Sequence, residues 1–276
     1  MTYTALITGC STGIGRELAQ QLHSKGWHVF VTARRLESLK EFEQQARFTT
    51  VALEVNDKTQ RDALLAFIEQ HGRLDLLVNN AGYGAMGPII EMPESELKQQ
   101  FATNVFAPLA LAQLCFPLLR QSPKATIVNL GSVSGILTTP FSGAYCATKA
   151  ALHSLSDALR MELAPFGIQV ITIQPGAIES EFGNNASQSL LATLPKDSVY
   201  QPLKPFIEAR ANASQQNSTS TTAFVKQMVA AIEEANPKAE TRIGSGSTAL
   251  PLLRRLLPLK VVDGILKKKF GLNKKL

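Results

Sequence analysis

A tyrosine and a lysine four residues apart, Tyr145 and Lys149, are the side chains in this sequence best suited to proton transfer. They fall in a stretch with a helical pattern, so the i, i+4 spacing brings both side chains to one face. Moving a tyrosine pKa from about 10 to about 7 takes roughly 4 kcal/mol of preference for the phenolate. A neighbouring ammonium in a partly desolvated cleft can supply much of that preference. The pair therefore indicates general acid–base chemistry, although the same spacing also occurs on solvated helix surfaces.

Two hydroxyls precede this pair, in the run Asn129-Leu-Gly-Ser-Val-Ser-Gly135. The run closes a predicted strand, and ligands of open α/β sheets bind at the carboxyl ends of the strands. Ser132 is the candidate donor of a hydrogen bond to a substrate carbonyl oxygen. Ser134 is a weaker candidate for the same role because of its position in the register of the strand end.

A glycine-rich turn, Thr8-Gly-Cys-Ser-Thr-Gly-Ile-Gly15, follows the first predicted strand and opens an amphipathic helix. Glycines let the backbone approach a pyrophosphate closely, and the free N–H groups of the helix N-terminus point at the anion. A purely structural corner is the alternative, but a position in the first βα unit favours nucleotide binding. The predicted cofactor-binding residues of the turn are Gly9, Ser11, Thr12, Gly13, Ile14 and Gly15.

The end of the second predicted strand favours NADP(H) over NAD(H). An acid that would accept the ribose 2′-hydroxyl is missing there; Arg34 and Arg35 follow Ala33, and the nearest acid is Glu37. A guanidinium offers a charge-assisted fork to phosphate oxygens, which suits a 2′-phosphate. Solvated arginines at a strand end are the alternative.

Short β-branched runs alternate with helical patterns along the chain, which is typical of βαβ units and a parallel sheet. This predicts an α/β fold: one doubly wound Rossmann domain with a mostly parallel seven-stranded sheet and helices on both faces. The predicted strands are 4–8, 28–33, 49–54, 76–79, 126–130, 169–174 and 241–243. The predicted helices are 14–25, 36–46, 58–71, 95–119, 144–164 and 222–235.

Two segments fall outside this alternation. Residues 182–222 are long and polar and are predicted to be an insertion that forms a substrate loop within a dehydrogenase-type domain of residues 1–249. Residues 250–276 form a basic extension whose apolar Val261, Val262, Ile265, Leu266 and Phe270 are predicted to share one helical stripe.

The net charge of +6 is concentrated at the end of the chain. Residues 254–276 hold eight basic side chains and one acid, a local charge of +7, whereas the other 253 residues hold 20 basic and 21 acidic side chains. The body is therefore near neutral, and a nucleic-acid partner is not predicted. Two roles are possible for this extension. It could form a helix that covers the substrate cleft or packs against a neighbouring subunit, with its lysines solvated, or it could attach to anionic lipid.

Composition excludes other classes. Three scattered cysteines make no disulfide framework and fit a reducing compartment, and the N-terminus shows no signal-peptide pattern, so a cytoplasmic location is expected. The apolar run 105–119 contains two prolines and falls short of a membrane span, which predicts a buried helix. No metal is predicted, because no ligand pattern is formed by His23, His28, His71 and His153.

Taken in chain order, these motifs resemble those of the short-chain dehydrogenase/reductase family, and the resemblance extends from Thr4 to about Gly244. Further matches are Asn79-Asn-Ala-Gly82 after the fourth strand, Asn104, and Pro175-Gly176 after the sixth. In that family the tyrosine exchanges a proton with the substrate oxygen, and the serine polarises the same oxygen. The lysine holds the nicotinamide ribose and lowers the tyrosine pKa, while the asparagine backbone positions a relay water. The resemblance assigns these catalytic roles to Tyr145, Ser132, Lys149 and Asn104.

The resemblance also extends the cofactor site. The acid–valine pair near the adenine, usually aspartate in the family, is here Glu54-Val55, which makes this contact less certain. Serine replaces a common threonine at Ser180 but can still donate the hydrogen bond to the nicotinamide carboxamide. The cofactor-binding residues implied are Glu54, Val55, Asn80, Ala81, Gly82, Tyr145, Lys149, Pro175, Gly176, Ile178 and Ser180.

The predicted function is thus hydride transfer between NADP(H) and a carbonyl or alcohol substrate. The mostly apolar run Gly135–Phe141 favours a lipophilic substrate such as a sterol, retinoid or long-chain aldehyde or ketone, with a 3-oxoacyl thioester as alternative. A catalytically silent NADP-binding regulator or membrane-surface scaffold is the alternative function. A homodimer or homotetramer is expected through the helices near 105–119 and 150–163, with burial inside one subunit as the alternative.

Overall fold

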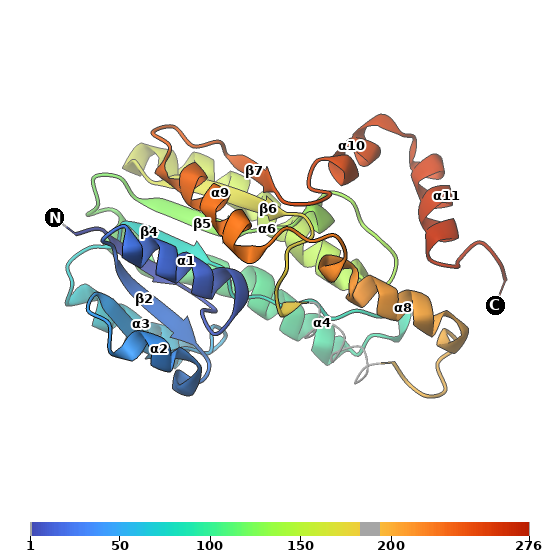
Figure 1. The fold of residues 1–276 in the computed structure, drawn as a ribbon, viewed down its shortest axis with the longest axis horizontal. Coiled ribbons are helices and arrows are strands. Elements are labelled where there is room, and N and C mark those ends of the chain that lie inside the picture. The colour runs from blue at the N-terminus through green and yellow to red at the C-terminus, as the bar shows by residue number, and fades with distance from the viewer. Residues whose placement is uncertain (1, 183–193, 276) are drawn as a thin grey trace.

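A seven-stranded parallel sheet forms the centre of the part of the chain that the computed structural model describes, residues 2–182 and 194–275 (Figure 1). The strand order is β3-β2-β1-β4-β5-β6-β7, so the crossover direction reverses between β1 and β4. This confirms the predicted doubly wound Rossmann fold. The strands are β1 (Thr4–Ile7), β2 (His28–Ala33), β3 (Phe48–Ala52), β4 (Leu76–Asn79), β5 (Thr126–Leu130), β6 (Gln169–Pro175) and β7 (Glu240–Ile243).

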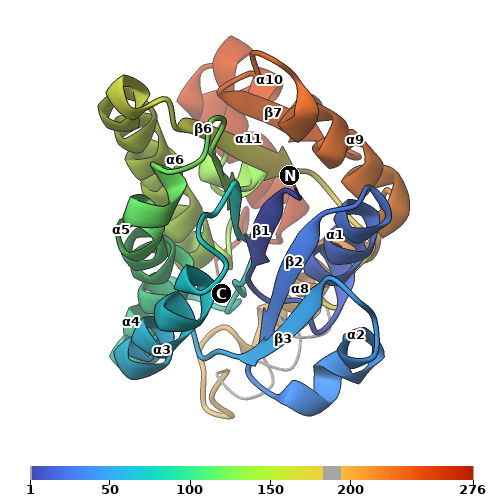
Figure 2. The ribbon, with the colours of Figure 1, turned by 90° about the vertical axis from the view of Figure 1, so that its left-hand side faces the viewer.

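Helices cover both faces of the sheet, and Figure 2 shows the two layers on either side of it. One layer contains α1 (Gly13–Ser24), α2 (Lys40–Glu43) and α9 (Thr221–Glu233). The other contains α3 (Lys58–Glu69), α4 (Glu94–Phe101), α5 (Ala107–Leu119) and α6 (Gly143–Leu163). All residues of β1, β4 and β5 are buried, as expected for parallel strands with helices on both faces.

The predicted helix 95–119 is in fact three elements. A π-helical turn, Ala102–Phe106, separates α4 from α5. The stretch Glu94–Leu119 is long and apolar enough to span a membrane, with mean hydropathy 1.5, but half of its most apolar window is buried inside the protein. Its buried Leu111, Cys115 and Leu118 belong to the core beneath the sheet, as a core helix requires.

The polar insertion and the basic extension both contain helices. Within the insertion lies α8 (Lys204–Ala211), and the extension forms α10 (Ala249–Leu256) and α11 (Leu259–Lys269). These three helices lie together at the end of the molecule opposite the N-terminus (Figure 1). The extension is divided just before α11 at Pro258, whose ring fixes φ and which cannot donate to a preceding turn.

The predicted single stripe of the extension is wrong in one respect. Val262 and Phe270 are buried and Leu266 packs in the same cluster as Phe270, whereas Val261 and Ile265 are exposed. Residues four apart lie nearly above one another on a helix, so positions 262, 266 and 270 form the inner line and 261 and 265 lie about 100° away.

Candidate active site

A cavity of about 940 Å³ opens at the carboxyl edge of the sheet, near the upper end of the range for ligand pockets. It runs from the turn after β1, past Tyr145 on α6, to α8 and α11. Its walls therefore come from segments more than 200 residues apart. Most of the predicted site residues line this cavity: Gly9, Ser11, Thr12, Gly13, Ile14, Arg34, Glu54, Val55, Asn80, Ala81, Gly82, Ser132, Tyr145, Lys149, Pro175, Gly176, Ile178 and Ser180.

The turn after β1 is held by the segment after β4. The Asn80 side-chain amide donates to the carbonyl oxygens of Thr8 at 2.7 Å and Gly9 at 3.0 Å. The Thr8 hydroxyl in turn accepts from the backbone N–H groups of Asn80 and Ala81. Gly15 does not line the cavity; a Cβ there would lie 2.5 Å from the Asn80 Nδ2 atom. Gly15 therefore allows close packing of the turn against Asn80.

The turn fits a dinucleotide pyrophosphate. Gly9 and Gly13 have φ values of +72° and +59°, which favour glycine and turn the backbone towards the helix N-terminus. The first N–H groups of α1 have no intrahelical acceptor and are available to an anion. A side chain on Gly13 would enter the space facing Ser180, so the missing Cβ keeps this part of the cavity open.

The adenosine end contains one of the two predicted arginines. Arg34 lines the cavity and Arg35 does not. Neither forms an ion pair within the described residues. Glu54 and Val55 line the same end. The Glu54 side chain accepts from the Asn56 backbone N–H at 3.2 Å, which fixes this loop.

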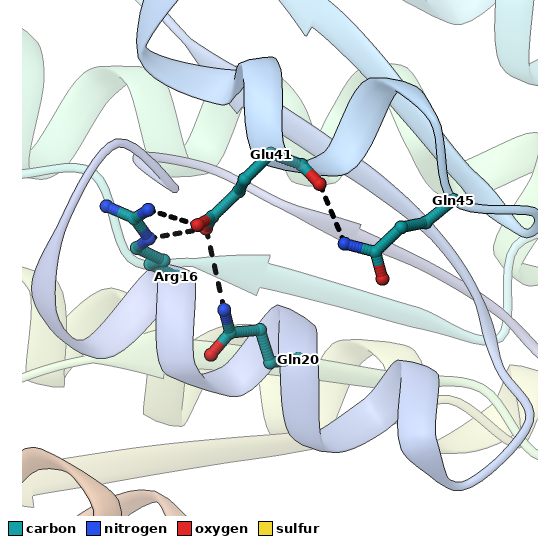
Figure 3. A network of polar contacts seen from close by, with 4 residues as sticks. All are labelled: Arg16, Gln20, Glu41 and Gln45. Atoms are coloured by element: carbon teal, nitrogen blue, oxygen red, sulfur yellow. Dashed lines mark hydrogen bonds and ion pairs between the residues drawn. The ribbon is translucent and has the colours of Figure 1, made fainter.

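A nearby third arginine is already neutralised. Arg16 on α1 forms an ion pair with Glu41 on α2, and Gln20 donates to the same carboxylate (Figure 3). The Gln45 amide donates to the backbone carbonyl of Glu41. This network joins α1 to the segment after β2, and it leaves Arg34 and Arg35 as the uncompensated cations of that corner.

Tyr145 and Lys149 lie on one face of α6, as the spacing predicts, and both are buried. The Lys149 ammonium lies 5.8 Å from the centre of the Tyr145 ring and donates to the Leu130 carbonyl at 2.6 Å. The Phe182 ring packs on Tyr145 with centroids 5.2 Å apart. Gly84 permits this approach, since a Cβ there would lie 2.8 Å from Phe182.

The expected lowering of the tyrosine pKa is not present in the protein alone. Burial raises the pKa of Tyr145 to about 12, although the Ser132 hydroxyl and the Arg210 charge both act to lower it. Burial also lowers the pKa of Lys149 to about 8. Lys149 is not among the groups that lower the pKa of Tyr145, and its ammonium donates to the Leu130 carbonyl instead. Tyr145 is therefore a neutral phenol at pH 7, the form that donates a proton.

Ser132 begins a short turn after β5, and His153 of α6 supports it. The Ser132 backbone N–H donates to the His153 Nε2 atom at 3.3 Å, and the Ser132 hydroxyl accepts from the Ser134 N–H at 3.1 Å. Cβ atoms on Gly131 and Gly135 would lie 2.3 and 2.6 Å from the His153 ring, so the turn packs directly on the imidazole. Burial, followed by the Lys149 charge, lowers the pKa of His153 to about 4.

Asn104 lies in the π-helical turn and does not line the cavity. Its side chain is buried, donating to the Tyr83 carbonyl at 2.8 Å and to the Thr148 hydroxyl at 3.1 Å, and accepting from the Tyr83 N–H. It thereby connects the loop after β4 to α6. π-helical turns are frequent at functional sites, because they free a backbone carbonyl from the α-helical ladder.

The segment after β6 closes the cavity on another side. A Cβ on Gly176 would lie 2.0 Å from the Ser245 carbonyl oxygen, so only glycine fits where this segment passes β7. Ile178 is buried and pairs with Thr219, and Ser180 accepts from the Phe182 N–H at 3.4 Å. Pro175 to Ser180 therefore form a rigid wall on the nicotinamide side of the predicted site.

Sequence reasoning missed three contributors: His153, Phe182 and Arg210. His153 and Arg210 follow no local motif, and each reaches the site only through tertiary packing. Phe182 was recognisable only as the first residue of the insertion. The apolar and basic extension also contributes wall residues, namely Leu250, Leu266, Lys269 and Phe270. This fits the interpretation that the extension folds over the substrate cleft.

The arrangement fits hydride transfer to or from a carbonyl carbon. A nicotinamide dinucleotide, when bound, supplies or accepts the hydride. The turn after β1, Arg34 and the wall after β6 could hold it, and Tyr145 and Ser132 line the same cavity. Within the described residues, no group of three or more His, Cys, Asp or Glu side chains could hold a metal ion.

Comparisons with known proteins agree with this geometry. The family model for short chain dehydrogenases matches residues 3–190. The short-chain dehydrogenase PC-15 of Penicillium crustosum is 38% identical over 230 residues, covering 82% of this chain and 83% of that protein. An NADPH-dependent 3-dehydrocapnine reductase of Ornithobacterium rhinotracheale is 30% identical over 271 residues, covering 95% of each.

A solved structure gives the same result for the fold. A short-chain dehydrogenase/reductase of Burkholderia phymatum, in complex with NAD, is 25% identical with a TM-score of 0.78, covering 96% of this chain and 95% of that chain. The two cofactors differ between these relatives, so they support NAD(P) binding without choosing between NAD and NADP. The extent of the match, together with the cavity and its residues, shows that this chain belongs to the short-chain dehydrogenase/reductase family of oxidoreductases.

Proposed function

We propose that this protein is an NADP(H)-dependent oxidoreductase that interconverts a lipophilic carbonyl compound and its alcohol, with Tyr145 as the acid/base. The observation that carries the proposal is the convergence of Tyr145, Ser132 and Lys149 on one cavity that also contains the glycine-rich turn. All three catalytic side chains are intact, which argues against a silent cofactor-binding regulator or scaffold.

The proton transfer follows from the burial of Tyr145. Its pKa of about 12 keeps the phenol protonated at neutral pH, ready to donate to a carbonyl oxygen as hydride reaches the carbon. Ser132 stabilises the charge that develops on the same oxygen. Lys149 lies against the phenol ring and supplies a positive charge in a low-dielectric environment, which favours proton release.

Arg34 supports NADP(H) as the cofactor. It lines the adenosine end of the cavity, is exposed, and has no ion-pair partner among the described residues, so its guanidinium is available to a 2′-phosphate. Glu37, the nearest acid, is exposed and is not a wall residue. A relative named as NADPH-dependent is consistent with this choice.

The far end of the cavity supports a lipophilic substrate. Beyond Tyr145 its walls include six apolar side chains, Leu137, Phe182, Phe206, Leu250, Leu266 and Phe270. A sterol, a retinoid, or a long-chain aldehyde or ketone would bury its apolar surface there. A 3-oxoacyl thioester is the alternative substrate class.

The decisive experiment measures NADPH oxidation against carbonyl compounds graded by chain length and polarity. Tyr145→Phe keeps the ring but removes the acid, so kcat/KM should fall by about 100-fold or more. Tyr200→Phe is the matched control, because Tyr200 packs near Phe141 and is not a wall residue. Comparable turnover by wild type and Tyr145→Phe would contradict the mechanism. NADPH binding without turnover of any compound would favour the silent regulator.

The same assay tests the cofactor preference. Wild type should have a higher kcat/KM with NADPH than with NADH, and Arg34→Ala should remove most of the difference by raising the KM for NADPH. A preference for NADH that persists in Arg34→Ala would overturn the assignment.

We also propose that the extension attaches this otherwise cytoplasmic protein to anionic lipid surfaces. α10 and α11 expose apolar side chains, with Leu256 67% and Leu259 58% exposed. Arg254, Arg255 and the lysines 267–269 are exposed on the same helices, a combination that suits the boundary between lipid headgroups and acyl chains. Because α11 is also a wall of the cavity, attachment would bring the site close to a lipophilic substrate.

Self-association is the remaining proposal. Phe106 and Met161, at the start of α5 and near the end of α6, are 59% and 62% exposed. Exposed apolar side chains on these neighbouring helices support a homodimer or homotetramer. Light scattering should give a multiple of 29.9 kDa; a monomer at micromolar concentration would contradict it.

A further inference from the structure

An arginine that the proposed mechanism does not use lies in the wall of the active-site cavity. Arg210 is near the end of α8, and its Nε donates to the Thr139 hydroxyl at 2.7 Å. Thr139 belongs to the loop after β5, which also carries Ser132. The guanidinium thus lies on the substrate side of Tyr145, opposite the glycine-rich turn.

The charge of Arg210 has no carboxylate partner in the described residues, where no ion pair joins it to an Asp or Glu within 4.0 Å. Residues 183–193 add none, since their sequence contains no Asp or Glu. The protein groups that act on it electrostatically are Cys146 and Tyr145, both close by along α6. These are a thiol and a phenol, and neither is a carboxylate.

This arrangement is costly for the protein alone. Burial lowers the pKa of Arg210 from its ordinary value, yet a guanidinium remains charged at any physiological pH. Its Nε donates to the Thr139 hydroxyl, and the Cys146 side chain is a second hydrogen-bond partner, so none of its partners in the described residues is an anionic carboxylate. Arg210 is partly buried, and a charge removed from water is costly unless a partner of opposite sign offsets the desolvation. A ligand that brings an oxyanion would supply that partner.

The other charges of the cavity agree with an anionic ligand at this end. Lys269 of α11 is a second cationic wall residue, near Phe270. Of the wall acids, Glu54 lies at the adenosine end, and Glu181 is exposed and has a partner of its own. The described part of the substrate end therefore combines apolar walls with a positive charge.

We propose that Arg210 binds an acidic group of the substrate, so that the natural substrate is a lipophilic carbonyl compound or alcohol that also carries a carboxylate or another oxyanion. The proposal rests on the proposed oxidoreductase function and narrows its substrate class. The apolar walls take the chain, Tyr145 and Ser132 take the reacting oxygen, and the guanidinium fork takes two oxygens of the acid.

A second role would leave a different signature. Arg210 also lowers the pKa of Tyr145, so it could act on the reaction only through the phenol. In that case its removal would reduce kcat for charged and uncharged substrates alike and shift the pH profile of both. Recognition of an acid instead predicts an increase in KM for acidic substrates alone.

The test uses pairs of probes that differ by one charge: 2-oxo-, 4-oxo- and 6-oxododecanoate and their methyl esters. Binding is measured from thermal stabilisation in the presence of NADP⁺, which cannot reduce the ketone, so the result does not depend on turnover. Kinetics with NADPH on the same pairs then give KM and kcat. The three positions of the oxo group cover different distances between the ketone and the acid.

In wild type, at least one acid should bind ten-fold or more tightly than its ester. Arg210→Gln should bring that ratio close to one, mainly through KM, while Arg210→Lys should retain part of it. Lys204→Gln is the matched control, because it removes an exposed cation from the same helix outside the cavity and should leave the ratio unchanged. Arg210→Gln should fold, since it removes a partly buried charge that has no anionic partner in the described residues.

Equal binding of every acid and its ester by wild type would overturn the proposal, as would a preference for acids that survives Arg210→Gln. If Arg210→Gln unfolds, Arg210→Lys becomes the deciding variant. It keeps a positive charge but lacks the guanidinium fork. If it prefers acids over their esters as strongly as wild type does, the fork does not bind the acid. Failure of wild type to reduce any ketone would contradict the proposed function, and the binding ratio would still test the anion site.

Discussion

One backbone hydrogen bond and close packing fix the turn that carries the hydroxyl of Ser132, a proposed catalytic group. Ser132 can polarise a substrate oxygen only if the turn after β5 holds its backbone still, and that turn packs on the ring of His153. The His153 Nε2 atom accepts from the Ser132 N–H, which requires a neutral imidazole with its proton on Nδ1. His153, one helical turn after Lys149 on α6, is therefore a positioning residue that holds the backbone of Ser132.

This neutral imidazole makes stability depend on pH. The pKa of His153 is about 4 in the folded protein, against about 6.5 when exposed, because burial and the Lys149 charge disfavour its protonation; Arg242 acts in the same direction and Asp157 opposes it. Between these pH values the unfolded chain binds more protons, so the free energy of unfolding should fall as pH falls from 6.5 towards 4. The slope from one group is at most about 1.4 kcal/mol per pH unit.

Urea unfolding at pH 4.5 to 7 should therefore show a shallower pH dependence for His153→Gln than for wild type. The pKa of His28 is also lowered by burial, but that residue is present in both proteins and cancels in the difference. Parallel curves would mean that His153 is not held neutral by the fold. Loss of kcat in His153→Gln, with NADPH affinity unchanged, would further identify it as a positioning residue for Ser132.

At the scale of elements, polar side chains between strands align the ends of the sheet. Asn79 at the end of β4 donates to Asn129 on β5 at 2.8 Å, and Asn129 donates to Ser156 on α6 at 2.8 Å. Asn80, the next residue, holds the turn after β1. The switch point between β1 and β4, where open α/β sheets bind ligands, is thus stabilised by buried amides rather than by the turn alone.

Removing the Asn80 amide should weaken cofactor binding. Asn80→Ala leaves the Thr8 and Gly9 carbonyls without two hydrogen bonds, and a lost buried bond costs about 1–3 kcal/mol. We expect the Kd for NADPH, measured by its fluorescence, to rise about ten-fold or more. Gln169→Ala is the control, because it removes an amide-to-carbonyl bond at the opposite edge of the sheet. An unchanged Kd in Asn80→Ala would show that the turn keeps its shape without the hydrogen bonds of the Asn80 amide.

For the whole molecule, the distribution of charge matters more than its sum. The body is near neutral, and residues 254–276 carry +7, most of it on α10 and α11, which also expose leucines and valine. Such a segment attracts anionic lipid at long range and buries its apolar side chains at contact. The helices are held on the body by the inner line of α11, so attachment would orient the cavity.

Sedimentation with vesicles containing phosphatidylserine should detect this attachment at low salt. Lys267→Gln with Lys268→Gln should reduce binding by about 30-fold, since each basic residue near an anionic surface contributes about 1 kcal/mol. Raising ionic strength should weaken the binding of wild type by screening. Lys196→Gln with Lys226→Gln, exposed cations outside the extension, should have little effect. Absence of sedimentation at low salt would exclude the membrane proposal.

Local patterns determined a large part of this protein. The parallel sheet followed from the alternation of β-branched runs with helical stretches, because the central strands are buried on both faces and their sequences are therefore mostly apolar. The glycine-rich turn and the Tyr145–Lys149 pair were likewise visible, since glycine turns and i, i+4 pairs are encoded within a few residues. The boundaries near the π-helical turn at Asn104 were not visible, because its sequence also fits a continuous α-helix.

Tertiary structure alone decided what surrounds those motifs. Arg210 reaches the cavity 65 positions after Tyr145, from a helix in the polar insertion, and no spacing rule connects the two. The inner line of α11 and the direction of the Lys149 ammonium depend in the same way on packing between distant segments. The residues proposed for hydride and proton transfer thus lie in short motifs that can be recognised from the sequence. The pKa values of Tyr145 and Lys149 are shifted by burial, which exists only once the chain has folded. The placement of Arg210 and of α11 in the cavity wall likewise depends on the folded chain.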